Sequence, residues 1–175
     1  MYLDMHIKCG IRALTLGLST DADTIGWLNN LGTAFWTRSW QLGQLSNLDI
    51  ALDYLTRAKQ LLPQNSMVLP DILHNIGNCF LQWFKCHSAK ADINLAFEHH
   101  QQVMVLTPEE TPEMAHQLNS LSLVLQQCYH ILGDSNNLDN AVDYQKKAVR
   151  LMKEGDLEMP GRLRNLGVVY EARFE

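Results

Sequence analysis

The sequence predicts an all-α fold, a solenoid of antiparallel helix hairpins with about eight helices. Three observations predict it. Residue patterns recur without gaps every 45 positions along the 175-residue chain. Within each unit, apolar positions follow one another at steps of three, four and seven, which is the spacing of one helix face. Helix-capping residues and helix breakers recur at matching positions between these stretches. Because a single hairpin cannot bury its apolar stripe alone, stacked hairpins are expected.

The repeat is clearest in a short motif of the first helix in each unit. Asn30-Leu31-Gly32 recurs as Asn75-Ile76-Gly77 and Asn165-Leu166-Gly167, and Ser120-Leu121-Ser122 occupies the remaining position. Other columns keep one residue type: Leu28, Leu73, Leu118 and Leu163; Ala51, Ala96 and Ala141; Leu61, Leu106 and Leu151. The small residues are expected to let two helices approach closely, while the large ones fill the space beside them.

The register places each element in turn. Residues 2–17 are predicted to form a second helix (helix B) without its first (helix A), because Ala13 and Leu16 lie 45 positions before Ala58 and Leu61. Three repeats follow at 21–65, 66–110 and 111–155, and 156–175 is a final helix A. We place the A helices near 22–42, 67–87, 112–132 and 157–175, and the B helices near 48–62, 93–107 and 138–153. Together they are expected to form a single domain over 1–175.

The predicted helix ends rest on capping chemistry. One column before the A helices holds residues whose side-chain oxygens can accept from free backbone N–H groups: Asp21, Ser66, Thr111 and Asp156. A second column is predicted to cap the B helices: Asn47, Asp92 and Asn137. Pro112 suits the first helical position, which needs no N–H. Gly43 and Gly133 suit the left-handed position that ends helix A.

These columns resemble the tetratricopeptide (TPR) repeat. In that family, helix A carries a large apolar residue, Leu-Gly and an aromatic residue, and helix B carries two alanines around an apolar position before a closing proline. The first unit has Leu28, Leu31-Gly32, Phe35, Ala51, Leu55, Ala58 and Pro63 in these places. The second has Leu73, Ile76-Gly77, Phe80, Ala96, His100, Val103 and Pro108. In the third unit, Ser122 and Lys153 depart from the pattern. The resemblance implies a right-handed superhelix.

The period also departs from the family, whose usual unit has about 34 residues. Seven of the extra residues lie between Gly32 and Ala51, which lengthens helix A by about two turns. This extended 45-residue unit resembles the TPR arrays of large fungal proteins, where phrases like Leu28–Gly32 and Asn47–Ala51 recur. Such arrays often accompany a nucleotide-binding or protease-like domain, which we do not find in this sequence.

The resemblance also implies a binding groove along the concave helix A face. Twelve residues occupy the family's groove positions: Asn29, Thr33, Trp36 and Thr37; His74, Asn78, Leu81 and Gln82; Asn119, Leu123, Gln126 and Gln127. A groove of this kind would be rich in amides, which can donate to and accept from an extended peptide backbone. The alternative interpretation is that these positions are simply solvated.

Some TPR proteins grip a terminal carboxylate with Lys, Asn and Arg side chains. The corresponding positions here hold Asn29, Thr33, Asn75, His116 and Ser120, which include no cation. We therefore expect no carboxylate clamp of that kind.

Composition and motifs exclude several functions. The net charge of -5, with acids and bases interspersed, argues against nucleic acid as the partner. No apolar run is long enough to span a membrane. No nucleophile elbow or phosphate-binding loop is present, so we expect no enzyme and no cofactor. Neither the four cysteines nor the seven histidines have metal-ligand spacing, so no metal is expected. Unpaired cysteines favour a reducing, cytoplasmic location.

The function predicted from the sequence is a protein–protein interaction scaffold or adaptor that binds a peptide or a partner helix on the helix A face. The alternative is a structural or self-association segment of a larger repeat array, such as the sensor region of a multidomain protein. Neither predicted end is polar enough to cap a solenoid, so a homo-oligomer formed through the exposed ends is also expected.

Overall fold

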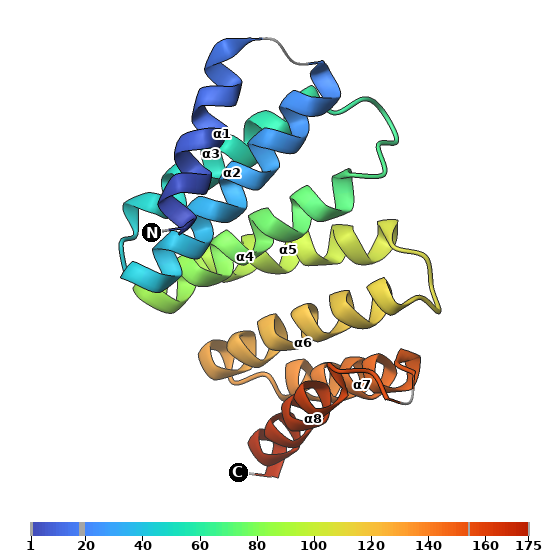
Figure 1. The fold of residues 1–175 in the computed structure, drawn as a ribbon. Coiled ribbons are helices and arrows are strands. Elements are labelled where there is room, and N and C mark those ends of the chain that lie inside the picture. The colour runs from blue at the N-terminus through green and yellow to red at the C-terminus, as the bar shows by residue number, and fades with distance from the viewer. Residues whose placement is uncertain (1, 18–19, 154, 175) are drawn as a thin grey trace. The chain divides into compact units, whose positions relative to one another are not determined.

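A computed structural model describes residues 2–17, 20–153 and 155–174. These residues form eight helices and no strand, which confirms the all-α fold (Figure 1). The helices are α1 (Tyr2–Leu16), α2 (Asp21–Leu42), α3 (Ser46–Leu61), α4 (Leu69–His87), α5 (Lys90–Leu106), α6 (Pro112–Leu132), α7 (Ser135–Leu151) and α8 (Met159–Phe174). Predicted A helices correspond to α2, α4, α6 and α8, and predicted B helices to α1, α3, α5 and α7.

The helices belong to two compact units, Met1–Ala89 with α1–α4 and Lys90–Glu175 with α5–α8. The boundary between the units falls inside the predicted second repeat, 66–110. The single domain over 1–175 and the handedness of its superhelix therefore stay predictions, and each unit is described by itself.

The ends of the A helices follow the sequence prediction in part. Thr111 caps α6, its hydroxyl accepting from the N–H of Met114, and Pro112 opens that helix. Gly43 and Gly133 both adopt the left-handed conformation and end α2 and α6. The prediction that Asp21 caps α2 was wrong. The cap is Thr20, which forms a reciprocal capping box with Asp23. The caps of α4 and α8 also differ, since α4 begins after Val68 and α8 begins at Met159.

The predicted caps of the B helices were wrong. Asn47, Asp92 and Asn137 all lie inside helices that begin earlier, at Ser46, Lys90 and Ser135. Asn47 shows why at α3: its side chain is buried, and its Oδ1 accepts from the Arg38 guanidinium at 2.7 and 3.1 Å. At α7 the cap is Asp134, whose carboxylate accepts from the N–H of Asn136.

The close approach of helix A to helix B organises the first unit. A Cβ atom on Gly32 would lie 2.5 Å from Leu55 Cγ and 3.2 Å from the Ala51 carbonyl oxygen, so α2 and α3 can meet there only through a glycine. Leu28, Leu31, Phe35, Leu48 and Leu55 surround the contact in the buried core.

The second unit repeats this contact with different chemistry. Ser122 occupies the glycine position of the repeat, and its Oγ donates to the Ala141 carbonyl oxygen at 3.0 Å. The departure of Ser122 from the family motif is therefore compatible with close packing of α6 on α7. Leu121, Leu125, Leu138 and Val142 belong to the apolar cluster around it.

Two ion pairs are compatible with the predicted helix B position of α1. Arg38 on α2 lies 3.6 Å from Asp4 on α1, and Arg173 on α8 lies 2.8 Å from Asp139 on α7. The two pairs are three repeat periods apart in both partners. Helix α1 therefore contacts α2 as α7 contacts α8 (Figure 1).

Replacing Gly32 with alanine should destabilise the protein by about 1–3 kcal/mol, because the new methyl group overlaps Leu55 and the backbone of Ala51. Gly26→Ala on the same helix is the matched control, since its added Cβ meets nothing within 4 Å. That change should be neutral or stabilising by up to about 1 kcal/mol through helix propensity. Urea denaturation would measure both, and equal effects of the two variants would contradict the proposed contact.

Candidate functional site

The structure places the predicted groove residues on three A helices. Asn29, Thr33, Trp36 and Thr37 lie on α2, His74, Asn78, Leu81 and Gln82 on α4, and Asn119, Leu123, Gln126 and Gln127 on α6. Most are half-buried, Leu81, Asn119 and Gln126 are buried, and Leu123 is exposed. The first two groups belong to the first unit and the third to the second unit, so the groove is described here as separate stretches.

Several of these side chains bridge neighbouring A helices. In the first unit, the Asn75 amide donates to Asn29 Oδ1 at 3.0 Å, and the Gln82 amide donates to the Ser39 hydroxyl at 3.1 Å. In the second unit, Asn165 donates to Asn119 Oδ1 at 2.8 Å. Within each asparagine pair the two residues are 46 positions apart in the sequence, one more than the 45-residue repeat. Asn29 and Asn119 therefore hold adjacent A helices together, in addition to any contact with a partner.

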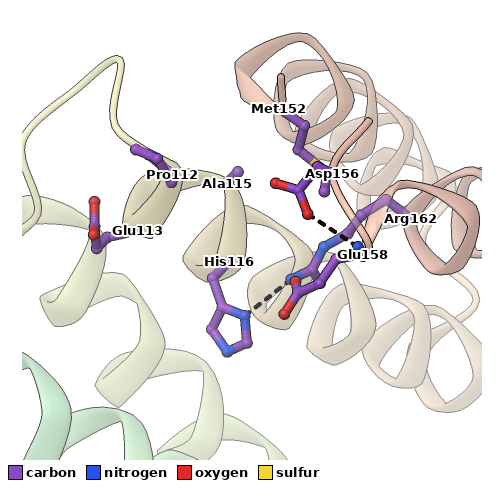
Figure 2. A pocket seen from close by; sticks show the side chains of 8 residues that line it. All are labelled: Pro112, Glu113, Ala115, His116, Met152, Asp156, Glu158 and Arg162. Carbon is purple, nitrogen blue, oxygen red and sulfur yellow. Dashed lines mark hydrogen bonds and ion pairs between the residues drawn. The ribbon is translucent and has the colours of Figure 1, made fainter. Parts of the chain in front are cut away.

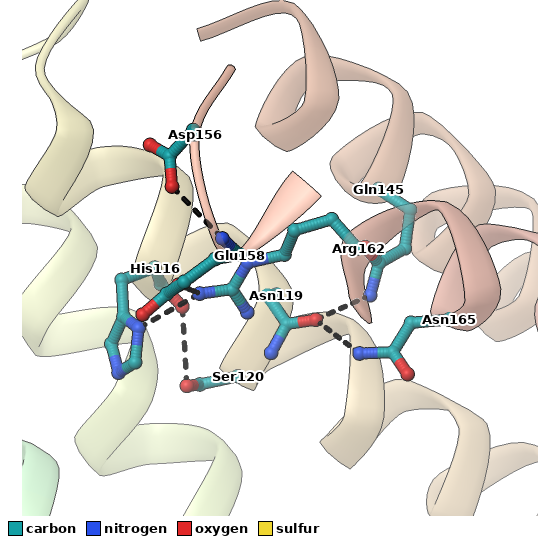
Figure 3. Close-up of polar contacts among 8 residues, drawn as sticks. All are labelled: His116, Asn119, Ser120, Gln145, Asp156, Glu158, Arg162 and Asn165. Atoms are coloured by element: carbon teal, nitrogen blue, oxygen red, sulfur yellow. Dashed lines mark hydrogen bonds and ion pairs between the residues drawn. The ribbon is translucent and has the colours of Figure 1, made fainter. Parts of the chain in front are cut away.

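Asn119 is the centre of a buried amide network in the second unit (Figure 3). Its Oδ1 also accepts from Gln145 Nε2 on α7 at 3.0 Å. Gln145 is fully buried and occupies the column that holds Leu55 in the first unit. A single oxygen thus joins α6, α7 and α8.

A charged cluster between α6 and α8 is the most distinctive polar feature of the described residues. Arg162 is only 7% exposed. Its Nη2 lies 2.6 Å from Glu158 Oε2 and 2.9 Å from His116 Nδ1 (Figure 3). Its Nε is buried and bonds to none of the described residues. A buried guanidinium is costly unless it is paired, so Glu158 and His116 set its position.

Local turns position these partners. Asp156 precedes α8, and its carboxylate accepts from the Glu158 N–H at 2.9 Å. This bond holds the residues just before α8 in place. Glu158 lies four residues before Arg162, about one helical turn away, where its carboxylate can accept from the guanidinium. On the opposite side, Thr111 and Pro112 begin α6 one turn before His116.

Two adjoining hollows open on this cluster and share His116, Glu158 and Arg162. One has a volume of about 280 Å³ (Figure 2), lined by Pro112, Glu113, Ala115, His116, Met152, Asp156, Glu158 and Arg162. The other, of about 350 Å³, is lined by His116, Leu157, Glu158, Gly161, Arg162, Arg164 and Asn165. The first collects three acids, whereas the second has two arginines and one acid. The second hollow is therefore suited to an anionic or amide side chain.

Arg162 is the residue that the sequence analysis missed. His116 had been considered for a carboxylate clamp, and the clamp was rejected because no cation was present at the corresponding positions. Arg162 supplies a cation from the next helix A. One signal in the sequence points to it: Arg162 is the charged member of a column that otherwise holds Trp27, Ile72 and Gln117.

The environment of His116 lowers its pKa from the ordinary value of 6.5. Burial is the largest cause, the Arg162 charge adds to it, and the Glu158 carboxylate acts in the opposite direction. The bond from Arg162 requires His116 Nδ1 as an acceptor, which is available only on a neutral ring.

The described residues show no cluster of three or more His, Cys, Asp or Glu side chains that could hold a metal ion. All four cysteines are free thiols. Burial raises the pKa of Cys79 to about 12 and also raises the pKa of Cys128. These two buried thiols are therefore poor nucleophiles. None of the described helices is long and apolar enough to cross a membrane.

Comparison with known proteins supports the fold alone. No protein-family model matches the chain, and no curated protein matches it. Among solved structures, the crystal structure of BtubC (BKLC) from P. vanneervenii is similar, with a TM-score of 0.60 and 21% sequence identity. The match covers 97% of this chain and 64% of that one, so the chain spans about two thirds of the length of its structural neighbour. The class of protein that these findings define is an all-α helical-repeat-like fold.

Lowering the pH should destabilise the protein through His116. The folded protein holds the ring neutral, whereas the unfolded chain protonates it near 6.5. The unfolded state then binds more protons, so the contribution of His116 to stability is complete above 6.5 and is lost as the pH falls through the lower, folded-state pKa. His116→Gln should show a shallower loss of stability in acid than the natural protein. Urea denaturation across the pH range would measure both proteins, and identical pH profiles would contradict the assignment.

Asn119→Ala should destabilise the second unit by about 1–3 kcal/mol, because it leaves the buried Gln145 amide and the Asn165 amide without their acceptor. Asn29→Ala is the matched change in the first unit, where one donor is lost and the side chain is only half-buried. Its effect should be smaller when both variants are unfolded with urea. If Asn29→Ala lowered the free energy of unfolding as much as Asn119→Ala or more, the buried amide network would not be the source of the stabilisation.

Proposed function

We propose that this chain is a non-catalytic scaffold or adaptor module of the TPR kind, acting in the cytoplasm and binding an extended segment of a partner protein on its helix A face. The observation that carries the proposal is the pair of adjoining hollows between α6 and α8, which are built around His116, Glu158 and Arg162. The similarity to BtubC supports the helical framework on which such a face would be built.

The size and lining of the hollows favour a polypeptide over a small-molecule cofactor. Volumes of about 280 and 350 Å³ are at the lower limit of cofactor and drug-sized sites and suit one or two side chains each. Both lie against A helices, where the amides of Asn165 and Asn119 already bond across helices. An extended peptide could place an acidic side chain near Arg164, with its backbone along the amide positions.

Unmet hydrogen-bonding capacity elsewhere on the A helices is compatible with this proposal. Trp36 Nε1, Gln82 Oε1 and Gln126 Nε2 are buried and bond to none of the described residues. All three belong to the groove positions implied by the TPR resemblance. Small side-chain movements would turn these atoms toward a bound peptide, which would offset the cost of leaving them unpaired.

A second candidate function is a structural or self-association segment of a larger array. The observation that favours it is the apolar face of α8, where Leu163 and Phe174 are exposed. The two candidates use different surfaces, so substitutions in the hollow and on the α8 face discriminate between them.

Selection of random peptides on the immobilised chain should enrich sequences with Asp or Glu. A synthetic peptide with one of the enriched sequences should bind the Arg164→Glu variant at least tenfold more weakly than the natural chain. Reversing the charge at the contact should cost about 1.4 kcal/mol or more. Arg150→Glu on α7 is the matched control, an exposed arginine outside both hollows, and it should bind normally. Calorimetric titration would measure all three affinities. Equal affinity for both variants, or no enrichment of acidic peptides, would contradict the proposed face.

A further inference from the structure

The two hollows beside Arg162 differ in charge. Both are lined by the same three residues, His116, Glu158 and Arg162. The first hollow adds Glu113 and Asp156, so among the described residues it has three carboxylates against one guanidinium. The second adds Arg164, which gives it two guanidiniums against one carboxylate. At neutral pH the ring of His116 is uncharged, because its pKa is below 6.5. One hollow is therefore negative and its neighbour is positive.

The ion pair between Glu158 and Arg162 lies where the two hollows adjoin. Arg162 Nη2 is 2.6 Å from Glu158 Oε2 (Figure 3). The Glu158 side chain is 63% exposed, so its carboxylate can accept from a second donor. Arg162 Nε is buried and bonds to none of the described residues, so the guanidinium keeps a donor for an incoming acceptor. Each member of the pair can therefore contact a further side chain of opposite charge.

The lining of the first hollow suits a Lys or Arg side chain. Pro112, Ala115 and Met152 provide apolar surface, along which the methylene groups of such a side chain can lie. Glu113 and Asp156 belong to the same lining (Figure 2), and their carboxylates can accept from its charged end. The acids of the described residues form no cluster able to hold a metal ion, which favours a basic side chain over a bare cation.

We infer that the partner segment carries a basic residue as well as an acidic one, and that the two side chains enter the adjoining hollows on either side of the Glu158–Arg162 pair. The basic side chain lies in the first hollow and the acidic side chain in the second. This inference rests on the proposed function, in which the acidic residue binds near Arg164, and it adds the second half of the sequence that is recognised.

An extended segment can deliver both side chains at once. Side chains two residues apart in an extended chain project from the same side, about 6.6 Å from each other. The hollows share three lining residues, so their occupants are neighbours. We therefore expect the basic and the acidic residue of the partner to be two positions apart. A segment with two like charges at this spacing is disfavoured, because one of the hollows repels one of its side chains.

The test begins with random peptides selected on the immobilised natural chain. Enriched sequences should pair Asp or Glu with Lys or Arg at a spacing of two residues. A synthetic peptide with one of these sequences is capped at both ends, so that it carries no terminal charge. It should bind roughly tenfold more tightly than its counterpart with Gln in place of the basic residue. Calorimetric titration would measure both affinities.

Glu113→Lys reverses a charge that lines the first hollow and not the second. It should weaken binding of the paired peptide roughly tenfold. A third peptide, with Glu in place of the basic residue, should bind Glu113→Lys more tightly than it binds the natural chain, a rescue that a loss of folding cannot produce. Glu171→Lys is the matched control, an exposed glutamate of α8 outside both hollows, and it should bind all three peptides as the natural chain does.

Equal affinity of the natural chain for the paired peptide and for its Gln counterpart would overturn the inference, as would enrichment of acidic residues without a basic one. In both cases binding of acidic peptides would still depend on Arg164, and the proposed function would stand. If no acidic peptide is enriched, or if Arg164→Glu binds as the natural chain does, the proposed function fails and this inference fails with it. Circular dichroism of Glu113→Lys should match that of the natural chain, since the position is exposed.

Discussion

The structure depends on how closely helix A can approach helix B. In the first unit a missing side chain at Gly32 provides the room, and Leu55 and the backbone of Ala51 occupy it. In the second unit Ser122 takes the place of the glycine, and its buried hydroxyl is satisfied by donating to the Ala141 carbonyl oxygen. The large apolar residues beside these contacts can fill the core only because the backbones are already close. The same requirement explains why α8 exposes apolar surface, since it carries the small residue and the apolar stripe but no described helix covers them.

A second regularity connects each helix A to the next. Side chains 46 residues apart meet in three described pairs, Asn29 with Asn75, Asn119 with Asn165, and His116 with Arg162. The first two pairs are neutral amides that hold helices together. The third pair, a titratable ring and a cation, lies three residues before Asn119 and Asn165 on the same two helices, and the hollows open beside it. The candidate site therefore uses the spacing that connects successive A helices, at positions held by Gly26 and Ile72 in the first unit.

Much of the fold could be predicted from the sequence because the repeat fixes the backbone. The 45-residue columns placed all eight described helices within a few residues of their observed bounds and identified Gly43 and Gly133 as helix ends. Contacts between side chains on different helices were less accessible. Asn47 was assigned to capping because its type suits a cap, whereas its burial beside Arg38 depends on how α2 and α3 pack. Arg162 was overlooked for a similar reason: a single arginine in a charged segment looks solvated until its distance from His116 is known.

The buried amide of Gln145 has a consequence for the interchangeability of the repeats. An array built from three copies of the first repeat would keep its glycine contacts and its apolar core. It would place Leu55 where Asn119 requires a donor from Gln145, and the oxygen that joins three helices of the second unit would lose that donor. A consensus sequence averaged over the columns would replace Ser122 with glycine, whereas Leu55, His100 and Gln145 give their column no common residue. Repeats of this chain are consequently ordered parts, each matched to its own neighbours, and their sequence order is as much a determinant of the structure as the motif they share.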